Sequence, residues 1–283
     1  TIAYVEFTED KRSHALFKST PFLFDYTDTS DVTGKPILNF SLKERVIDYY
    51  YRKKPRSERE VISAINRAGL DDFIDQENVQ IYLNQMFQEV DLFKNDIALF
   101  EQRFVSPLSH YGISFYKYYL LDTLDVEGDR CIDLGFAPYN SESFGFAGHL
   151  YVVYEDSSYF IKRAKYSIPR NINMNYVDRM YLQQDYVRDS VGTRIKVRDD
   201  IVAEFRLYPG TAGLYARRTI NYSNFSTELP VNAEIFDVKT SEITLPSAEE
   251  HDEEFWTQHR AVPIKYQENA ISGIVDRLKE KPF

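Results

Sequence analysis

Cysteine is almost absent from this 283-residue chain, and long apolar runs are absent altogether. The single cysteine, Cys131, rules out an internal disulfide, so cysteine usage does not reveal the compartment in which the protein works. No apolar run approaches the roughly 18 residues that a membrane-spanning helix needs. The formal net charge of −10 argues against a nucleic-acid partner, because phosphate binding depends on a basic surface.

The chain also lacks an initiator methionine and a secretion signal. It starts with TIAYVEFTED, which reads as a strand, and no basic segment followed by an apolar segment precedes it. We therefore expect the chain to be a segment of a longer protein, whose export and anchoring signals lie outside it.

Catalytic and cofactor-binding motifs are missing as well. The sequence has no G-x-S-x-G nucleophile elbow, no phosphate-binding loop and no H-E-x-x-H zinc motif. The glycines of SFGFAG lack the strand-to-helix context of a dinucleotide site. We predict a non-enzymatic protein with no catalytic, cofactor-binding or metal-binding residues and no cofactor.

Aromatic residues are abundant instead. They make up 15% of the chain, with 22 Tyr and 20 Phe, and aromatic side chains favour strands. A hydrophobic fraction of 43% is enough to build a core. Residues 1–50 alternate short aromatic runs with the turn-rich segment DTSDVTGKP, which predicts two or three strands.

The next region predicts helices. In SEREVISAINRAG, residues 57–69, Ser57 and Glu60 match a capping box, an apolar stripe follows, and Gly69 supplies a stop. A second helix is predicted at about 76–91, where apolar residues recur at helical spacing.

From about residue 115 to residue 226 the apolar residues follow period 2, and the turn signals leave room for seven strands. In IKVRDDIVAEFRL, residues 195–207, apolar and charged side chains alternate, which predicts a half-buried strand. Because the connections are too short for crossover helices, we predict an up-and-down antiparallel meander. The predicted fold class is α+β: a curved, half-barrel-like antiparallel sheet over residues 1–245, packed on two or more helices.

Residues 246–283 return to a helical pattern. Carboxylates at the start of SAEEHDEEFWTQHRA suit a helix N-terminus, and Pro263 opens the last segment. We predict a helical tail that docks on the sheet through apolar side chains at helical spacing: Phe255, Trp256, Ile271, Ile274, Val275 and Leu278.

Cys131 is the first candidate for a reactive site. A nucleophilic cysteine needs a histidine or a cation beside it, and the nearest histidines in sequence are His110 and His149. A dyad of Cys131 and His149 is one hypothesis. A packed, inert thiol is the favoured one, because no base adjoins Cys131 along its strand.

Two further groups could bind metal ions. His251 and His259 lie eight residues apart with Asp252 and Glu254 nearby, whereas zinc ligands on one helix lie three or four apart. Asp25, Asp28 and Asp31 lie three apart, whereas a calcium loop places its ligands at every second position. A solvated helix start and a polar loop are the favoured interpretations.

Four segments resemble a known family. FVSPLSHYGISFYKYYLLDTLDVEGDRCIDLGFAP is similar to the core of uncharacterised outer-membrane proteins of Bacteroidetes, in which a carboxypeptidase-regulatory-like β-sandwich precedes a domain of unknown function and a membrane β-barrel. ERVIDYYYRKKPRSEREVISAINRAGL, FGFAGHLYVVYEDSSYFIKRA and EEFWTQHRAVPIKYQENAISGIVDRL resemble further parts of the same domain, the last being the link to the barrel. The resemblance covers most of residues 40–283 and extends, more distantly, to the half-barrels of periplasmic lipoprotein carriers.

This resemblance implies a place in the cell envelope, on the periplasmic side of the outer membrane, and no catalytic residue. We expect a structural or protein-interaction module whose partners are other envelope proteins or the barrel of its parent. The alternative is a carrier-like domain that holds a lipid, a lipoprotein segment or another apolar ligand between residues 57–91 and the sheet. The aromatic excess fits both hypotheses, and simple packing of the rings is the favoured one.

Overall fold

The computed structural model describes residues 2–6, 21–30, 34, 36–69, 88–155, 157–172, 174, 177–189, 192–205, 213–226 and 233–260, together with residues 264, 270, 271, 273, 274 and 277. These residues form mostly strands and a few short helices, so the helical share of the fold is smaller than predicted. In this part of the chain, no helix has the length and apolarity needed to cross a membrane.

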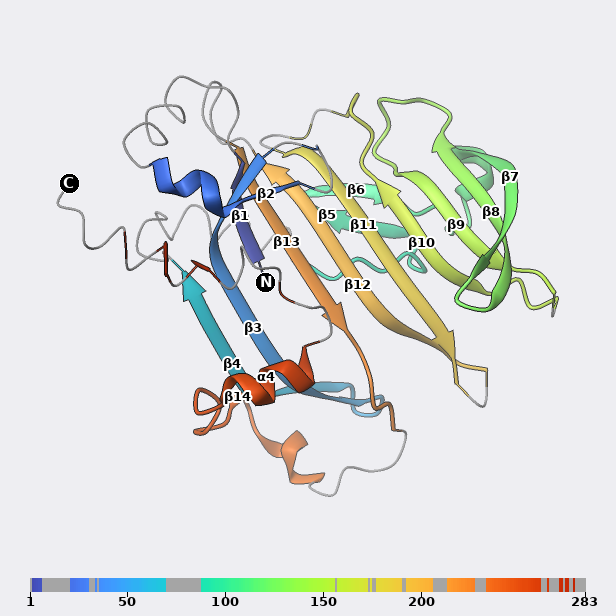
Figure 1. Cartoon of the computed structure of the whole chain (residues 1–283). Helices are drawn as coiled ribbons and strands as arrows, with labels where there is room; N and C mark the ends of the chain where they lie inside the picture. Colours follow the sequence, from blue (N-terminus) through green and yellow to red (C-terminus); the bar gives the residue numbers. More distant parts are fainter. Residues whose placement is uncertain are drawn as a thin grey trace.

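One open sheet dominates the molecule (Figure 1). Among the described residues it has twelve strands, in the order β14-β4-β3-β1-β13-β12-β11-β10-β9-β8-β7, with β2 attached to β3. Every pair in it is antiparallel except β14 with β4. The strands are β1 (Ile2–Glu6), β2 (Thr27–Thr29), β3 (Pro36–Arg52), β4 (Ser57–Gly69), β7 (Tyr116–Val126), β8 (Asp129–Pro138), β9 (Ala147–Val153), β10 (Ile161–Ser167), β11 (Val177–Arg188), β12 (Arg194–Phe205), β13 (Gly213–Asn221) and β14 (Glu242–Thr244).

The seven-stranded meander predicted between residues 115 and 226 is confirmed. Strands β7 to β13 lie side by side in chain order, and each runs antiparallel to the next. The β7–β8 connection shows why the chain turns back so tightly: Glu127 and Gly128 both have positive φ, of 53° and 85°, as a two-residue hairpin turn requires. The carboxylate of Asp125 accepts a hydrogen bond from the Gly128 amide at 3.0 Å.

The predicted helix at residues 57–69 is wrong. These residues form β4, which pairs with β3 over its whole length. Val61, Ile62 and Ile65 are β-branched, and the long strand β3 offers a complete row of hydrogen-bonding partners, so pairing overrides the helical signal of the capping box. The second predicted helix, at 76–91, lies outside the described residues except for its last positions.

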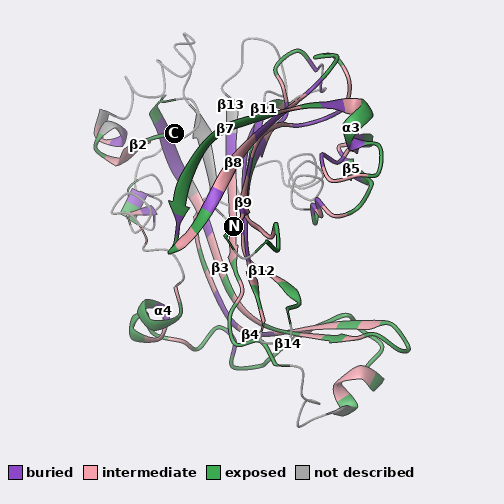
Figure 2. Ribbon diagram, turned by 90° about the vertical axis from the view of Figure 1, so that its right-hand side faces the viewer, coloured by how far each residue is buried: buried purple, intermediate pink, exposed green. Residues whose placement is uncertain are grey.

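Residues 88–115 cover one side of the sheet, here called the inner face, which carries Leu150, Ala164, Leu182 and Ile201. The cover includes the hairpin of β5 (Asp96–Leu99) and β6 (Gln102–Val105) and the one-turn helix α3 (Gly112–Phe115), seen on the right of Figure 2. Phe104 of β6 is fully buried and stacks on Phe146 at 4.9 Å between ring centroids. The sequence patterns did not predict this hairpin.

A buried polar network joins the cover to the inner face. The Gln184 side-chain oxygen accepts hydrogen bonds from the hydroxyls of Tyr166, at 3.0 Å, and Tyr186, at 2.8 Å. Its amide nitrogen donates to the Val90 carbonyl at 2.7 Å and to the Asp199 carboxylate at 3.0 Å. All four hydrogen-bonding positions of this amide are therefore used, as a fully buried side chain requires.

Strand β12 keeps its predicted alternation but is more buried than predicted. Ile201 and Ala203 join the core of the inner face, whereas Asp200 and Glu204 face the opposite side. Every residue from 199 to 205 is buried, so the prediction of a half-buried strand is wrong there. These charges are tolerated on the second side because Arg217 of β13 pairs with Asp200 and the Ser30 hydroxyl donates a hydrogen bond to Glu204.

The tail begins with the short helix α4 (Glu253–His259), which the Asp252 carboxylate caps by accepting a hydrogen bond from the Phe255 amide at 2.9 Å. Arg260 follows the helix and donates two hydrogen bonds to Glu44 of β3, at 2.8 and 2.9 Å. These bonds hold the tail against the β3–β4 hairpin.

Further along the tail, the predicted docking is confirmed for Ile271 and Ile274. Ile271 packs against Leu42 of β3, and Ile274 packs against Leu38 of β3 and Leu23 of the 3-10 helix η1 (Pro21–Tyr26). The predicted contacts of Val275 and Leu278, and a continuous helix over the tail, lie outside the described residues.

Candidate interaction site

The outer edge of β7 pairs with no strand among the described residues. Tyr116 and Val126, at its two ends, are buried, whereas the strand between them is largely exposed, as Figure 2 shows. Four large apolar side chains are exposed in the middle: Tyr119 48%, Leu120 78%, Leu121 55% and Leu124 38%. An apolar strand edge of this length is a surface on which a further strand can pair.

A β-bulge explains why so many apolar side chains of β7 are exposed. The register with β8 shifts between Leu120 and Asp122, which makes Leu121 an extra residue in the strand. The Leu121 side chain lies over Gly135 of β8, where an added Cβ would come within 2.8 Å of the Leu121 Cδ1 atom. Gly135 therefore provides the space that this leucine occupies.

The other end of the sheet is built differently. Strand β14 has only three residues, and Glu242 and Thr244 in it are exposed. Natural sheets protect their edges with short strands and charged side chains. β14 follows this rule throughout, whereas β7, although it carries a bulge and three charged side chains, is 11 residues long and exposes apolar side chains in its middle.

The charges of β7 are separated along the strand. Lys117 lies near its beginning, where its ammonium is 5.4 Å from the centre of the exposed Tyr139 ring. Asp122 and Asp125 lie in its second half. A complementary strand would therefore be acidic opposite Lys117, apolar in its middle and basic opposite the two aspartates.

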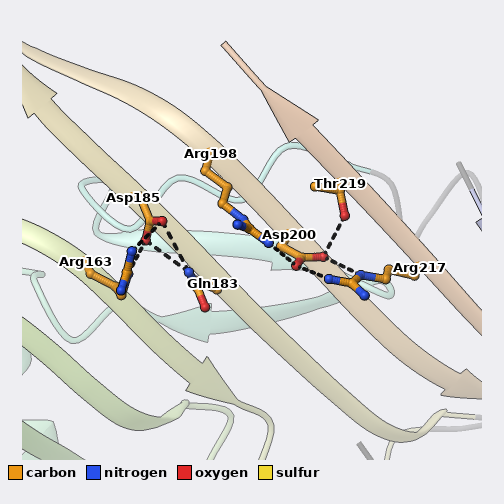
Figure 3. Close-up of polar contacts among 7 residues, drawn as sticks. All are labelled: Arg163, Gln183, Asp185, Arg198, Asp200, Arg217 and Thr219. Carbon is orange, nitrogen blue, oxygen red and sulfur yellow. Dashed lines mark hydrogen bonds and ion pairs between the residues drawn. The ribbon is translucent and has the colours of Figure 1, made fainter. Parts of the chain in front are cut away.

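The side of the sheet opposite the inner face, here called the outer face, carries a ladder of charged side chains across β10 to β13 (Figure 3). Arg163 of β10 donates hydrogen bonds to both carboxylate oxygens of Asp185 on β11, at 2.6 and 3.0 Å. Gln183 donates to the same carboxylate at 3.2 and 3.3 Å. The Asp185 carboxylate is thus enclosed by donors from its own strand and from the next strand.

Asp200 of β12 is the second carboxylate of the ladder. Arg217 donates to both of its oxygens, at 3.0 and 2.7 Å, and Arg198 and Thr219 add one hydrogen bond each. Burial alone would raise the pKa of Asp200, but the hydrogen bonds and positive charges of the two arginines lower it below its ordinary value. A carboxylate held in this way is a poor general base, and its hydrogen bonds join β12 to β13.

Cys131 is a buried, packed residue in this structure. Its side chain is fully buried with Val126 and Val153, and burial raises the pKa of its thiol, with a further contribution from the negative charge of Asp129. His149 does not activate it, because the imidazole Nδ1 lies 2.8 Å from the Asp133 carboxylate instead. These contacts favour the packing interpretation over the dyad.

The remaining candidates are not brought together as metal sites. The Phe255 ring lies between the imidazoles of His251 and His259, with ring centroids at 3.9 and 4.0 Å, so both nitrogens cannot reach one ion. Asp28 accepts a hydrogen bond from the neighbouring Thr29 amide, and Asp31 lies outside the described residues. In the described part of the chain, no three potential ligands are grouped around a common point.

The apolar groove predicted between residues 57–91 and the sheet is not formed by residues 57–69, since these belong to the sheet itself. A half-open hollow of about 200 Å³ does occur at β4 and β14, but polar residues dominate its lining: Tyr49, Glu58, Glu60, Ser241 and Glu242. An apolar ligand gains little from such a lining.

The described residues thus define a class of protein, an open and mostly antiparallel sheet domain in which none of them pairs with the outer edge of β7. The chain belongs to the family of unknown function DUF5686, whose model matches residues 11–224. No curated protein and no solved structure matches the chain. The match confirms the predicted resemblance to a family of unknown function, whereas the envelope location and the neighbouring domains stay predictions.

Sequence reasoning missed the edge of β7. YKYYLLDTLDV was assigned to a strand of the meander, but nothing in its composition says which strand ends the sheet. One signal was present: the adjacent leucines Leu120 and Leu121 break the period-2 pattern, as an extra residue in a bulge does.

Proposed function

We propose that this protein is a non-enzymatic interaction module that binds a partner protein by strand addition to β7. The observation that carries the proposal is the long outer edge of β7, which pairs with none of the described strands and has Tyr119, Leu120 and Leu121 exposed in its middle. Strand addition satisfies the free backbone groups of the edge and removes the apolar side chains from water in one step.

The partner segment follows from the chemistry of β7. It is extended, it carries apolar side chains opposite the centre of β7, and it carries a basic side chain opposite Asp122 or Asp125. Each exposed leucine that becomes buried contributes about 1.5–3 kcal/mol, so a few such contacts supply the affinity of a specific complex.

We further propose that this module works in the cell envelope, on the periplasmic side of the outer membrane, as part of a larger protein. The support is the resemblance of four segments of the sequence to outer-membrane proteins of that organisation. The partner is then another envelope protein or another part of the parent chain.

A role as carrier of an apolar ligand has less support. In the described residues the inner face is filled by its own aromatic and aliphatic side chains, with Phe104, Phe146 and Leu150 fully buried. A ligand in that place would have to displace them at a cost of several kcal/mol.

Site-directed photocrosslinking in producing cells tests the proposal. A photoreactive amino acid replaces Leu120 in one variant and Phe225, an exposed residue after β13, in the control. The expected result is one dominant adduct from position 120 that position 225 does not give, crosslinked through an extended apolar segment of the partner.

The identified partner is then titrated against the purified chain. Leu120→Glu should weaken binding at least tenfold, because it places a charge in the apolar contact, and the partner should protect the backbone amides of residues 117–125 from hydrogen exchange. Equal adducts from both positions, or unchanged binding of the Leu120→Glu variant, would refute strand addition at β7.

A further inference from the structure

The end of the β3–β4 hairpin, residues 49–56, differs in charge from the rest of the protein. Its sequence is YYYRKKPR, with four basic residues and no acidic one, in a chain whose formal net charge is −10. We call these eight residues the hairpin tip. The proposed function makes no use of them.

The hairpin tip is exposed and projects from the sheet. Figure 2 shows the β3–β4 hairpin bending away from the other strands toward the lower right. Lys53, Lys54 and Pro55 are exposed, and Tyr51 and the Arg56 side chain are 54% and 78% exposed. Since a strand rises about 3.3 Å per residue, the turn lies roughly 10 Å beyond Tyr49, about one Debye length at physiological salt. Charges of the sheet beyond that distance are therefore largely screened at the turn. Glu58 lies closer and pairs with Arg56 at 3.0 Å, so the attraction to an anion rests mainly on Lys53 and Lys54.

Contacts with the 3-10 helix η3 (Ala233–Asp237) hold the base of the hairpin tip in place. The Arg52 guanidinium lies 4.6 Å from the centre of the Phe236 ring. Arg59, on the opposite strand, donates hydrogen bonds to the carbonyls of Phe236, at 3.3 Å, and Val238, at 2.5 Å. A braced hairpin presents its lysines and tyrosines without a further loss of backbone entropy on binding.

From these observations we propose that the hairpin tip binds an anionic lipid surface. Lysine and arginine at the turn are attracted to anionic headgroups, and tyrosines behind them suit the boundary between headgroups and acyl chains. The geometry favours a flat anionic surface over a nucleic acid, because Glu58 and Glu60 lie directly behind the turn. A polyanion that follows the hairpin would meet these carboxylates, whereas a membrane meets the turn first.

Vesicle sedimentation with the full chain tests this proposal. Vesicles of phosphatidylcholine alone are compared with vesicles that also contain phosphatidylglycerol. The chain should bind only the mixed vesicles, and added salt should weaken the binding. Lys53→Gln with Lys54→Gln should bind roughly thirtyfold more weakly, since each basic residue near an anionic surface contributes about fivefold in affinity.

A matched control variant has the same net charge as the Lys53→Gln, Lys54→Gln variant. Lys94→Gln with Lys165→Gln removes two exposed lysines that lie elsewhere, and this variant should bind as the unchanged chain does. Tyr51→Ser should weaken vesicle binding even in high salt, because it removes an aromatic contact rather than a charge. Circular dichroism and thermal unfolding confirm that each variant is folded.

Three outcomes would overturn the proposal. In the first, the unchanged chain does not bind the mixed vesicles. In the second, both double-lysine variants lose the same affinity for these vesicles. In the third, the chain binds soluble heparin but no vesicles. The Leu120→Glu variant should keep its affinity for vesicles, so a failure of lipid binding and a failure of strand addition at β7 are distinguishable.

Discussion

The Gln184 amide nitrogen donates a hydrogen bond to the Val90 carbonyl at 2.7 Å and so fixes the cover of the inner face to the middle of the sheet. The two residues are 94 positions apart in the chain. Gln184 also holds the Asp199 carboxylate and two tyrosine hydroxyls, so one side chain organises the polar centre of the interior.

Gln184→Leu should therefore lower the free energy of unfolding by about 3 kcal/mol, because it leaves several buried polar groups without partners. Urea denaturation measures the change. Gln183→Leu is the matched control on the outer face. Because Arg163 still donates hydrogen bonds to Asp185, this substitution should lower the free energy of unfolding by about 1 kcal/mol or less. Equal losses for the two variants would show that the network at Gln184 does not act as described.

Asp200→Asn should lower stability at neutral pH by about 1–3 kcal/mol, since Arg217 would lose its charged partner while it stays partly solvated. The folded state lowers the pKa of Asp200, so its contribution is present above the unfolded pKa near 4 and is lost as pH falls through the folded pKa. The difference in the free energy of unfolding between the variant and the unchanged chain should be constant from pH 8 to about pH 5 and should shrink below about pH 4. A difference that grows on acidification would contradict this assignment.

Cys131→Ala should cost about 1–2 kcal/mol of stability and leave partner binding unchanged, because the thiol fills a small apolar site. Burial raises the pKa of the thiol, so an alkylating reagent at neutral pH should react slowly with the native chain and rapidly in urea. Fast labelling of the native chain would show that the thiol is activated after all.

Arg260→Met should loosen the tail. The guanidinium bridges Glu44 of β3 and Glu253 of α4, and its hydrogen bonds to Glu44 raise the pKa of Arg260 further above its already high value. Without it, hydrogen exchange of residues 253–260 should become at least fivefold faster. Arg130→Met removes an exposed pair with Glu155 and should leave these rates unchanged. No change in the Arg260→Met variant would mean that apolar docking alone holds the tail.

The sequence by itself determined the meander of residues 115–226. Period-2 alternation and short turns are local properties, and a turn such as Glu127–Gly128 allows only an antiparallel return. The same local patterns predicted a packed Cys131, because no base adjoins it along its strand, and the structure places it in an apolar cluster. These features depend mainly on residues that lie close together in the sequence.

The tertiary structure decided the features that depend on distant partners. Residues 57–69 have a helical cap and an apolar stripe, yet they form a strand because β3 offers a complete edge for pairing. Asp199 and Asp200 of β12 are buried because arginines of β13 and of β12 itself reach them, and no local pattern shows that. Which strand ends the sheet is likewise a property of the whole order of strands. The edge position of β7 therefore follows only from the complete order of the described strands, because a strand edge is unpaired where no other strand forms hydrogen bonds with it.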